Sequence, residues 1–293
     1  MRRITFISVF IFAFSILLNG QNVDNIVFHS DYEKTNFYQF VKGEHAQLLD
    51  LQLMVDENVS STAAKDYHNK FEALVVEAKE KLDKINSDQR YLSWLFYRVH
   101  RKVLKNYVQY SPLAQVFETG DYDCLSATTL YALLLNELGF KTKVVETNYH
   151  IYLEVLTADA KYLIESTDAL NGFVYNQLEI DKRLVEYNAK NNSASTSEYA
   201  FNAKIHDAVD LNKLIGLQYY NRAVYTFNNG NILPTLDLLE KSTVFYHSER
   251  IVEFGIVLAQ AIMDDKSLDD EIKSVSINRV GSFIKAKDIV ASR

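Results

Sequence analysis

The spacing of apolar side chains predicts two long helices in the first half of the chain. Apolar residues recur every three or four positions, with lysine and glutamate between them, at Tyr67, Phe71, Leu74, Ala78 and Leu82. This is the period of a helix with one buried face, and residues 60–62 supply serine and threonine caps for its start. A second helix is predicted over residues 88–107, capped by Ser87, with a buried stripe of Leu92, Leu95, Phe96, Val99 and Val103.

The centre of the chain is almost continuously apolar and then becomes strand-like. Residues 125–138 are apolar at most positions, so we predict a buried helix that Gly139 ends. Runs rich in Val, Ile, Tyr and Leu predict three strands, at residues 143–147, 150–156 and 161–165. A short hairpin at 158–160 joins the last two. A buried helix followed by an antiparallel sheet predicts an α+β fold.

Composition divides the remaining chain into regions. The Asn- and Ser-rich run at residues 187–203 predicts a linker, because it can bury little apolar surface. Helical patterns return after it, at residues 211–227, 236–245, 251–263 and 272–290. We therefore predict an N-terminal helical region over 21–110, a core over 111–186 and a C-terminal helical region over 204–293.

Part of the C-terminal region resembles a tetratricopeptide repeat. Ala223 and Phe227 close one predicted helix, Gly230 follows as a turn, and residues 235–242 open the next helix. The resemblance implies that these helices bind a protein partner. Only one copy is legible, so a plain helical hairpin is the alternative interpretation.

The first twenty residues have the pattern of a secretory signal peptide. Arg2 and Arg3 precede an apolar run over residues 4–18, and Gly20 provides a small residue near the expected cleavage point. The run is shorter than the roughly 20 residues of a spanning helix, although an uncleaved anchor is the alternative. No later segment is apolar enough to span a bilayer. We therefore expect an exported protein, periplasmic or secreted, that begins near Gln21.

Composition excludes several classes of partner and cofactor. The chain has 293 residues and a net charge of −7, so it has no basic surplus for a nucleic acid. Its 1 cysteine cannot form an internal disulfide or a zinc cluster by itself. The histidines lack metal-ligand spacing, and no dinucleotide or phosphate-loop glycine motif occurs. We expect no cofactor and no metal.

The candidate chemistry centres on Cys124, at the predicted start of the buried helix. Free N–H groups and the helix dipole favour a thiolate there, whereas a negative Asp123 at the cap opposes it. His150 opens a predicted strand and Glu165 ends the next. Pairing residue 150 with residue 165 puts the turn centre between Thr157 and Ala158, so Glu165 is expected to hold the His150 ring.

These residues lie in segments that resemble the transglutaminase-like core, a superfamily with a papain-like fold. The resemblance covers about residues 111–170 and is carried by the segments 123–140, 150–155 and 162–167. It implies Cys124 as nucleophile, His150 as general base and acid, and Glu165 as the residue that orients the histidine. The chain has Tyr152 where the family usually has Trp, and Glu-Ser-Thr where Asp-Pro-Thr is common; Asp168 is an alternative orienting acid.

Two functional hypotheses follow. The first is an exported cysteine enzyme that transfers an acyl group from an amide, most simply by hydrolysing a peptide or protein substrate. The backbone N–H of Cys124 is then the expected oxyanion donor, with Gln115 as a side-chain candidate. Tyr149 and Tyr152 are candidate cleft walls, with sheet packing as the alternative. The second hypothesis is a non-catalytic binding protein in which Cys124 is a small buried hydrophobic residue.

Overall fold

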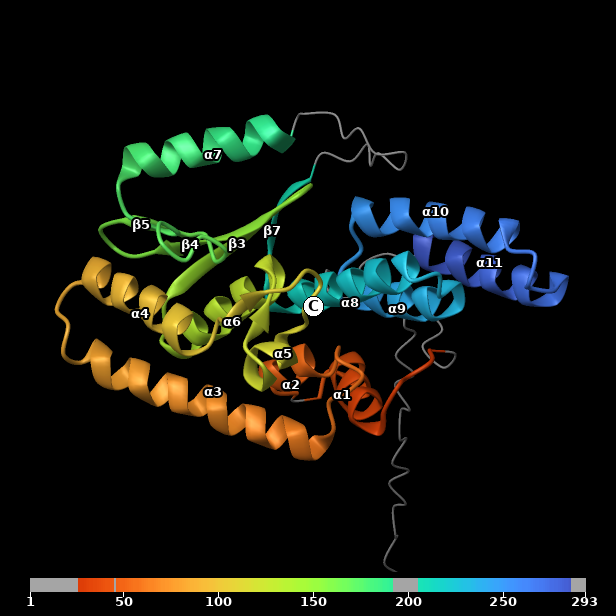
Figure 1. Cartoon of the computed structure of the whole chain (residues 1–293), viewed down its shortest axis with the longest axis horizontal. Helices are drawn as coiled ribbons and strands as arrows, with labels where there is room; N and C mark the ends of the chain where they lie inside the picture. Colours follow the sequence, from red (N-terminus) through yellow and green to blue (C-terminus); the bar gives the residue numbers. More distant parts are fainter. Residues whose placement is uncertain (1–25, 45, 192–204, 286–293) are drawn as a thin grey trace, which may run out of the picture.

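The computed structural model describes residues 26–44, 46–191 and 205–285 (Figure 1). The predicted signal peptide at residues 1–20 therefore lies outside the described residues, as do residues 192–203 of the predicted linker. The described chain is a mixture of helices and one main antiparallel sheet, which confirms an α+β fold.

The N-terminal part consists of four helices. They are α1 (Asp31–Lys42), α2 (Leu48–Leu53), α3 (Ser61–Leu82) and α4 (Asp88–Lys102). The first two were not predicted. Ser60 and Ser87 cap α3 and α4 by accepting hydrogen bonds from backbone N–H groups of the first turn, as the sequence predicts. The prediction that the second long helix reaches residue 107 was wrong. The chain instead becomes extended at β1 (Asn106–Tyr107), which pairs with β2 (Asp121–Tyr122) across the short helix α5 (Leu113–Glu118).

Helix α6 (Cys124–Glu137) and the sheet form the centre of the molecule. The sheet has the order β6-β5-β4-β3-β7, and each neighbouring pair is antiparallel. Its strands are β3 (Lys141–Thr147), β4 (Ile151–Leu156), β5 (Lys161–Ile164), β6 (Phe173–Val174) and β7 (His206–Val209). The hairpin lies where it was predicted, but its register differs. Leu153 pairs with Ile164, two residues away from the pairing that would place residue 150 opposite residue 165.

Alternating side chains fill two layers on the two faces of this sheet. On one face, Leu153 and Val155 join the large core that contains α6. On the other face, Tyr152 and Leu163 pack with Ile180 of α7 (Gln177–Asn191). Figure 1 shows α7 along the outer face of the sheet, with α6, α4 and α3 on the opposite side. The sheet is thus a central layer covered by helices on both faces.

The C-terminal part contains α8 (Leu211–Asn228), α9 (Ile232–Phe245), α10 (Glu249–Asp264) and α11 (Asp270–Lys285). Helices α8 and α9 form a hairpin whose turn uses Gly230 at a φ of 79°, in the left-handed region that favours glycine. The division of the chain at residues 187–203 needs two corrections. Residues 187–191 are the end of α7, and β7 from the C-terminal region completes the sheet beside β3. One continuous core joins Leu49, Leu134 and Phe283, so the predicted regions pack as one unit.

Candidate functional site

A pocket of about 320 Å³ opens at the N-terminal end of α6. Its walls come from the loop before α5, the facing ends of β3 and β4, and the C-terminal helices α8 and α10. Cys124 and His150 both line it, although 26 residues separate them in the sequence. The pocket therefore gathers the cysteine and the histidine that were predicted to act together.

Cys124 occupies its position because Asp123 fixes the start of α6. The Asp123 carboxylate accepts a hydrogen bond from the Ser126 backbone N–H at 2.7 Å, and the Ser126 hydroxyl accepts one from the Asp123 N–H at 2.9 Å. This reciprocal capping box satisfies backbone groups that would otherwise lack partners. Asn221 of α8 donates to the second Asp123 oxygen at 3.2 Å, so the cap is also tied to the C-terminal region. As a result the sulfur lies at the first residue of a rigid, buried helix.

The thiol of Cys124 is held in its protonated form. Burial, and then the charges of Asp123 and Glu165, together raise its pKa from 9.0 to about 12. The backbone N–H groups of Leu125 and Cys124 act in the opposite direction but do not outweigh these effects. Within the described residues no hydrogen bond joins Cys124 to His150. The described residues thus contain a thiol and a histidine that line one pocket, and not a preformed thiolate–imidazolium pair.

A hydrogen bond to Glu165 fixes the position of the His150 ring. Its Nε2 atom is hydrogen-bonded to the Glu165 carboxylate. A carboxylate accepts hydrogen bonds and cannot donate them, so Nε2 carries the proton and Nδ1 is the basic nitrogen. His150 and Glu165 are 15% and 8% exposed, which shields the pair from competing water.

Three further donors hold the Glu165 carboxylate in place. The hydroxyl of Tyr187 on α7 donates to Oε2 at 2.9 Å, and the hydroxyl and backbone N–H of Thr167 donate to Oε1 at 2.7 and 3.3 Å. Burial raises the pKa of Glu165, but the hydrogen bond and charge of His150, then Thr167 and Tyr187, outweigh it. The net pKa lies below the ordinary value, so Glu165 is ionised at neutral pH.

Two of the candidate residues, Gln115 and Asp168, do not line the pocket, contrary to their predicted roles. Gln115 lies on α5, and its amide donates to Asp56 at 3.3 Å and to Glu118 at 3.1 Å, away from Cys124. Asp168 accepts hydrogen bonds from the backbone of Leu170 and Asn171, which makes it part of a turn. The carboxylate that contacts His150 is therefore that of Glu165.

The two tyrosines that flank His150 have different places. Tyr149 lines the pocket, is 45% exposed, and donates a hydrogen bond to the backbone carbonyl of Tyr187 at 2.8 Å. Tyr152 is 1% exposed and packs against Tyr187 on the outer face of the sheet. Side chains alternate between the two faces of a strand, which explains why Tyr152 lies on the face opposite the α6 core. Tyr149 is a wall of the pocket, and Tyr152 is a packing residue.

Sequence reasoning missed the contribution of the C-terminal helices. Asn221 and Tyr220 of α8 and Arg250 of α10 line the pocket. Arg250 pairs with the buried Glu146 at 2.9 Å and donates to the Thr147 carbonyl at 2.6 Å, which fixes the ends of β3 and α10 against each other. Tyr107 of β1 and Gln109 from the loop before α5 also line the pocket. No local motif marks these residues, because they meet only through the packing of distant elements.

Metal sites and membrane-spanning helices are two further features to consider in the described residues. They contain no group of three or more His, Cys, Asp or Glu side chains that could hold a metal ion. None of the helices in residues 26–44, 46–191 and 205–285 is long and apolar enough to cross a membrane. Comparisons of the chain with protein-family models, with curated proteins and with solved structures found no match.

Proposed function

We propose that the protein is a cysteine hydrolase with a transglutaminase-like core, which cleaves an amide bond of a peptide or protein through Cys124, His150 and Glu165. The observation that carries this proposal is the anchored histidine. A buried, ionised carboxylate fixes one nitrogen of His150 while the ring lines the same pocket as the thiol. A positioned base beside a nucleophile, itself oriented by a third group, is the arrangement that acyl transfer requires.

The protonated thiol determines the order of events in this mechanism. Because the pKa of Cys124 is raised to about 12, few sulfur atoms are thiolate at neutral pH. Nδ1 of His150 therefore accepts the thiol proton as the sulfur attacks the carbonyl carbon of the amide, and the carbonyl π electrons move to its oxygen. The imidazolium then donates the same proton to the leaving nitrogen when the C–N bond breaks. Glu165 keeps its charge and stabilises the imidazolium in between.

The oxyanion and the acyl-enzyme have partners in the same pocket. The backbone N–H groups at the start of α6 lie beside the sulfur and are the donors for the oxyanion. Gln109, an exposed side chain on the pocket wall, replaces Gln115 as the candidate for a second donor. Water then attacks the thioester with His150 as the base. Each proton that leaves the nucleophile is returned to a leaving group, so the cycle balances.

A binding protein without catalysis is the second candidate function. The raised pKa of Cys124 and the lack of a hydrogen bond to His150 in the described residues favour this alternative, because both suit a thiol that is only packed. In that case the pocket and the C-terminal helices, which resemble a tetratricopeptide unit, hold a peptide or protein partner. Export through the signal peptide at residues 1–20 is part of both proposals, and N-terminal sequencing of exported protein tests it.

The deciding experiment compares the full chain with its Cys124→Ala variant on a complex mixture of peptides. Mass spectrometry then reads three products separately: new peptide termini from backbone cleavage, deamidated glutamine side chains, and crosslinks to an added amine. Any of the three that disappears in Cys124→Ala supports acyl transfer and names its type. Circular dichroism of the variant checks that it is folded. Identical product profiles for the two proteins would favour the binding function.

A further inference from the structure

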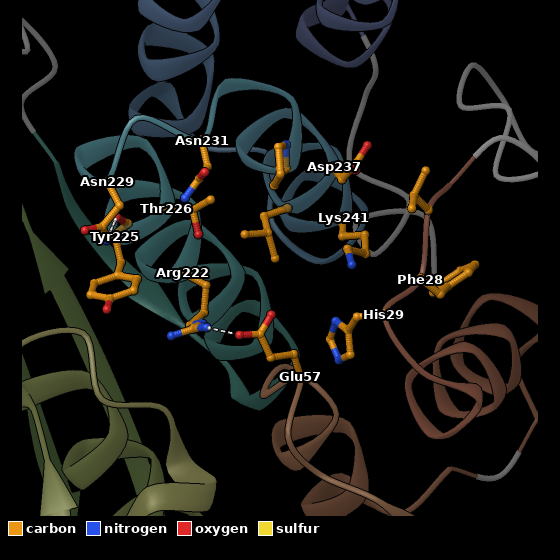
Figure 2. Close-up of a pocket in the computed structure, with 13 residues that line it drawn as sticks. Phe28, His29, Glu57, Arg222, Tyr225, Thr226, Asn229, Asn231, Asp237 and Lys241 are labelled. Carbon is orange, nitrogen blue, oxygen red and sulfur yellow. Dashed lines mark hydrogen bonds and ion pairs between the residues drawn. The ribbon is translucent and has the colours of Figure 1, made fainter.

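A second and larger pocket, of about 450 Å³, lies on the α8–α9 hairpin. Figure 2 shows it bounded by Phe28 and His29 of the N-terminal segment, by Glu57 from the turn between α2 and α3, and by side chains of both helices. It shares no lining residue with the Cys124 pocket. Its chemistry therefore needs its own explanation.

Most charges around this pocket are already neutralised by firm partners. Asp237 pairs with Arg279 of α11 at 2.7 Å. Lys241, whose side chain is 3% exposed, pairs at 2.6 Å with the fully buried Glu33, which His29 also contacts at 3.0 Å. The buried Lys241–Glu33 pair is costly to separate, and the Asp237–Arg279 pair is partly buried, so these charges form a fixed wall. They leave Arg222 and Glu57 as the pair with the most freedom to change partners.

Arg222 is held in place but only weakly paired. Its guanidinium group stacks over the Tyr225 ring at 5.3 Å and its side chain is 17% exposed. Among the described residues its hydrogen-bond partner is Glu57, through one bond at 3.3 Å, and the Glu57 side chain is 60% exposed. A guanidinium carries five N–H donors, so most of its capacity is unused. A pair with a single bond and one exposed partner contributes little stability, and Arg222 can exchange Glu57 for a better acceptor.

We propose that this pocket binds a polypeptide segment through an acidic side chain, whose carboxylate takes the place of Glu57 on Arg222. A carboxylate can accept two parallel N–H bonds from a guanidinium, which is stronger than the single bond that Glu57 makes. Glu57 then acts as an internal competitor that occupies Arg222 until the ligand binds. The proposal does not depend on the activity of Cys124, because it uses none of the residues of that pocket.

The remaining walls favour a peptide over a small anion or a nucleic acid. Thr226, Asn229 and Asn231 provide side chains that can bond to a peptide backbone, while Phe28 and Leu238 provide apolar surface. The side-chain amide of Asn229 donates to the Tyr225 carbonyl at 2.8 Å, which holds it and leaves its oxygen to accept from a backbone N–H. A nucleic acid would meet a protein of net charge −7, which has no surplus of basic residues to neutralise a phosphate backbone.

One ring contact connects this pocket to the Cys124 pocket. Tyr225 lines the second pocket, and its ring lies 6.4 Å from that of Tyr110, which lines the first. Tyr110 has a φ of 65°, a left-handed conformation that is unfavourable for a tyrosine and holds its ring beside Tyr225. A segment anchored at Arg222 can therefore continue across these two rings toward Cys124. If the proposed hydrolysis is right, the same segment is part of the substrate.

The test is a direct binding measurement on the full chain. The probes are three short, capped, fluorescein-labelled peptides of equal length in which alanine alternates with glutamate, glutamine or lysine, read by fluorescence anisotropy at low salt. We expect the glutamate peptide to bind more tightly than the other two. Arg222→Gln should weaken its binding by at least about tenfold, the scale of a lost charge-assisted hydrogen bond. Arg98→Gln is the control: it removes the same charge from the α3–α4 surface and should change the affinity for the glutamate peptide little.

Glu57→Gln gives the sharper test, because the proposal predicts that this variant gains affinity for the glutamate peptide. Removing the internal competitor should tighten binding of the glutamate peptide about two- to fivefold, the range of a released surface ion pair. A merely structural Arg222–Glu57 pair predicts unchanged or weaker binding, and that result would overturn the proposal. Equal affinity for the three peptides, or tighter binding of a single-stranded oligonucleotide, would also reject it. Anisotropy measures binding and requires no catalysis. A protein that binds the glutamate peptide but forms no product that depends on Cys124 would support this proposal and contradict the hydrolase proposal.

Discussion

Tyr187 and Glu165 are joined by a hydrogen bond of 2.9 Å that ties helix α7 to the acid behind His150. The Tyr187 ring also packs against Tyr152 at 5.1 Å and against His150 at 5.3 Å, and its backbone carbonyl accepts from Tyr149. A residue at the end of a surface helix thus contacts the anchored acid, the histidine and the pocket wall. Through Tyr187, the position of α7 helps to set the geometry of the site.

We predict that Tyr187→Phe weakens this anchor without unfolding the protein. The ring packing remains, but Glu165 loses one of its donors, which should cost about 1 kcal/mol of unfolding free energy in urea. The loss should also raise the pKa of Glu165, because Tyr187 helps to lower it. Tyr149→Phe is the control, since its hydroxyl bonds to a carbonyl at an exposed position. An equal loss in both variants would show that Glu165 is not the source of the effect.

The pH dependence of stability should identify Glu165. Its pKa in the folded protein lies below the ordinary 4.5, because His150, Thr167 and Tyr187 favour the charged form over the effect of burial. A lowered pKa stabilises the folded state above pH 4.5, and this contribution disappears as the pH falls from 4.5 through the folded value. The difference in unfolding free energy between wild type and Glu165→Gln should therefore shrink in that window. A difference that stays constant down to pH 2 would contradict the assignment.

Thiol chemistry provides a third prediction. With its pKa raised to about 12, Cys124 should react slowly with iodoacetamide at pH 7, and the rate should rise about tenfold per pH unit through pH 10. Asp123→Asn keeps a residue that can cap α6 but removes the nearest negative charge, so it should speed alkylation by up to about tenfold. Asp121→Asn is the control, because it removes the same charge from a residue that is not among the main causes of the raised pKa of Cys124. Fast alkylation of the wild type at pH 6 would instead indicate a thiolate paired with His150.

The local parts of this fold could be predicted because they depend on short-range chemistry. Ser60 and Ser87 start helices by capping, and the apolar run after Cys124 forms a buried helix whose C-cap, Leu138, precedes Gly139 at a positive φ. The predicted hairpin also brings His150 and Glu165 together, although its strands pair in a register two residues away from the predicted one. The side chains meet because both residues lie just outside the paired segments at the same end of the sheet.

The parts that the sequence did not predict depend on long-range packing. Strand β7 joins the sheet from beyond residue 204, and Arg250 reaches the pocket from α10. Neither has a local pattern that points to the sheet or to the pocket. Tyr187 was assigned to a linker because its neighbours are polar, yet its ring is half-buried against the sheet. Composition averages over a window, whereas one aromatic residue is enough to dock the end of a helix.

The last prediction concerns Gly172, which sets the path of the chain behind Glu165. Residues 165–172 form a tight loop in which Glu165 N–H donates to the Gly172 carbonyl at 2.8 Å and Gly172 N–H donates to the Asp168 carbonyl at 2.8 Å. A Cβ atom at position 172 would lie 2.1 Å from the Glu165 carbonyl oxygen and 2.5 Å from that of Asp168. Both contacts are with backbone, so no rotamer change can relieve them, and the loop itself must move.

Gly172→Ala should therefore lower the unfolding free energy by about 2 kcal/mol or more, and should draw Glu165 away from His150. The first effect is read by urea unfolding, and the second by the chemical shift of the His150 ring proton on Nε2. Gly281→Ala is the matched control, because nothing lies within 4 Å of the added carbon. In the interior of α11 this substitution should be neutral or stabilising by up to about 1 kcal/mol.

If Gly172→Ala keeps both its stability and the His150 signal, another part of the structure fixes Glu165. If stability falls while the signal persists, the loop supports the fold but does not position the acid. The proposal requires that both change together.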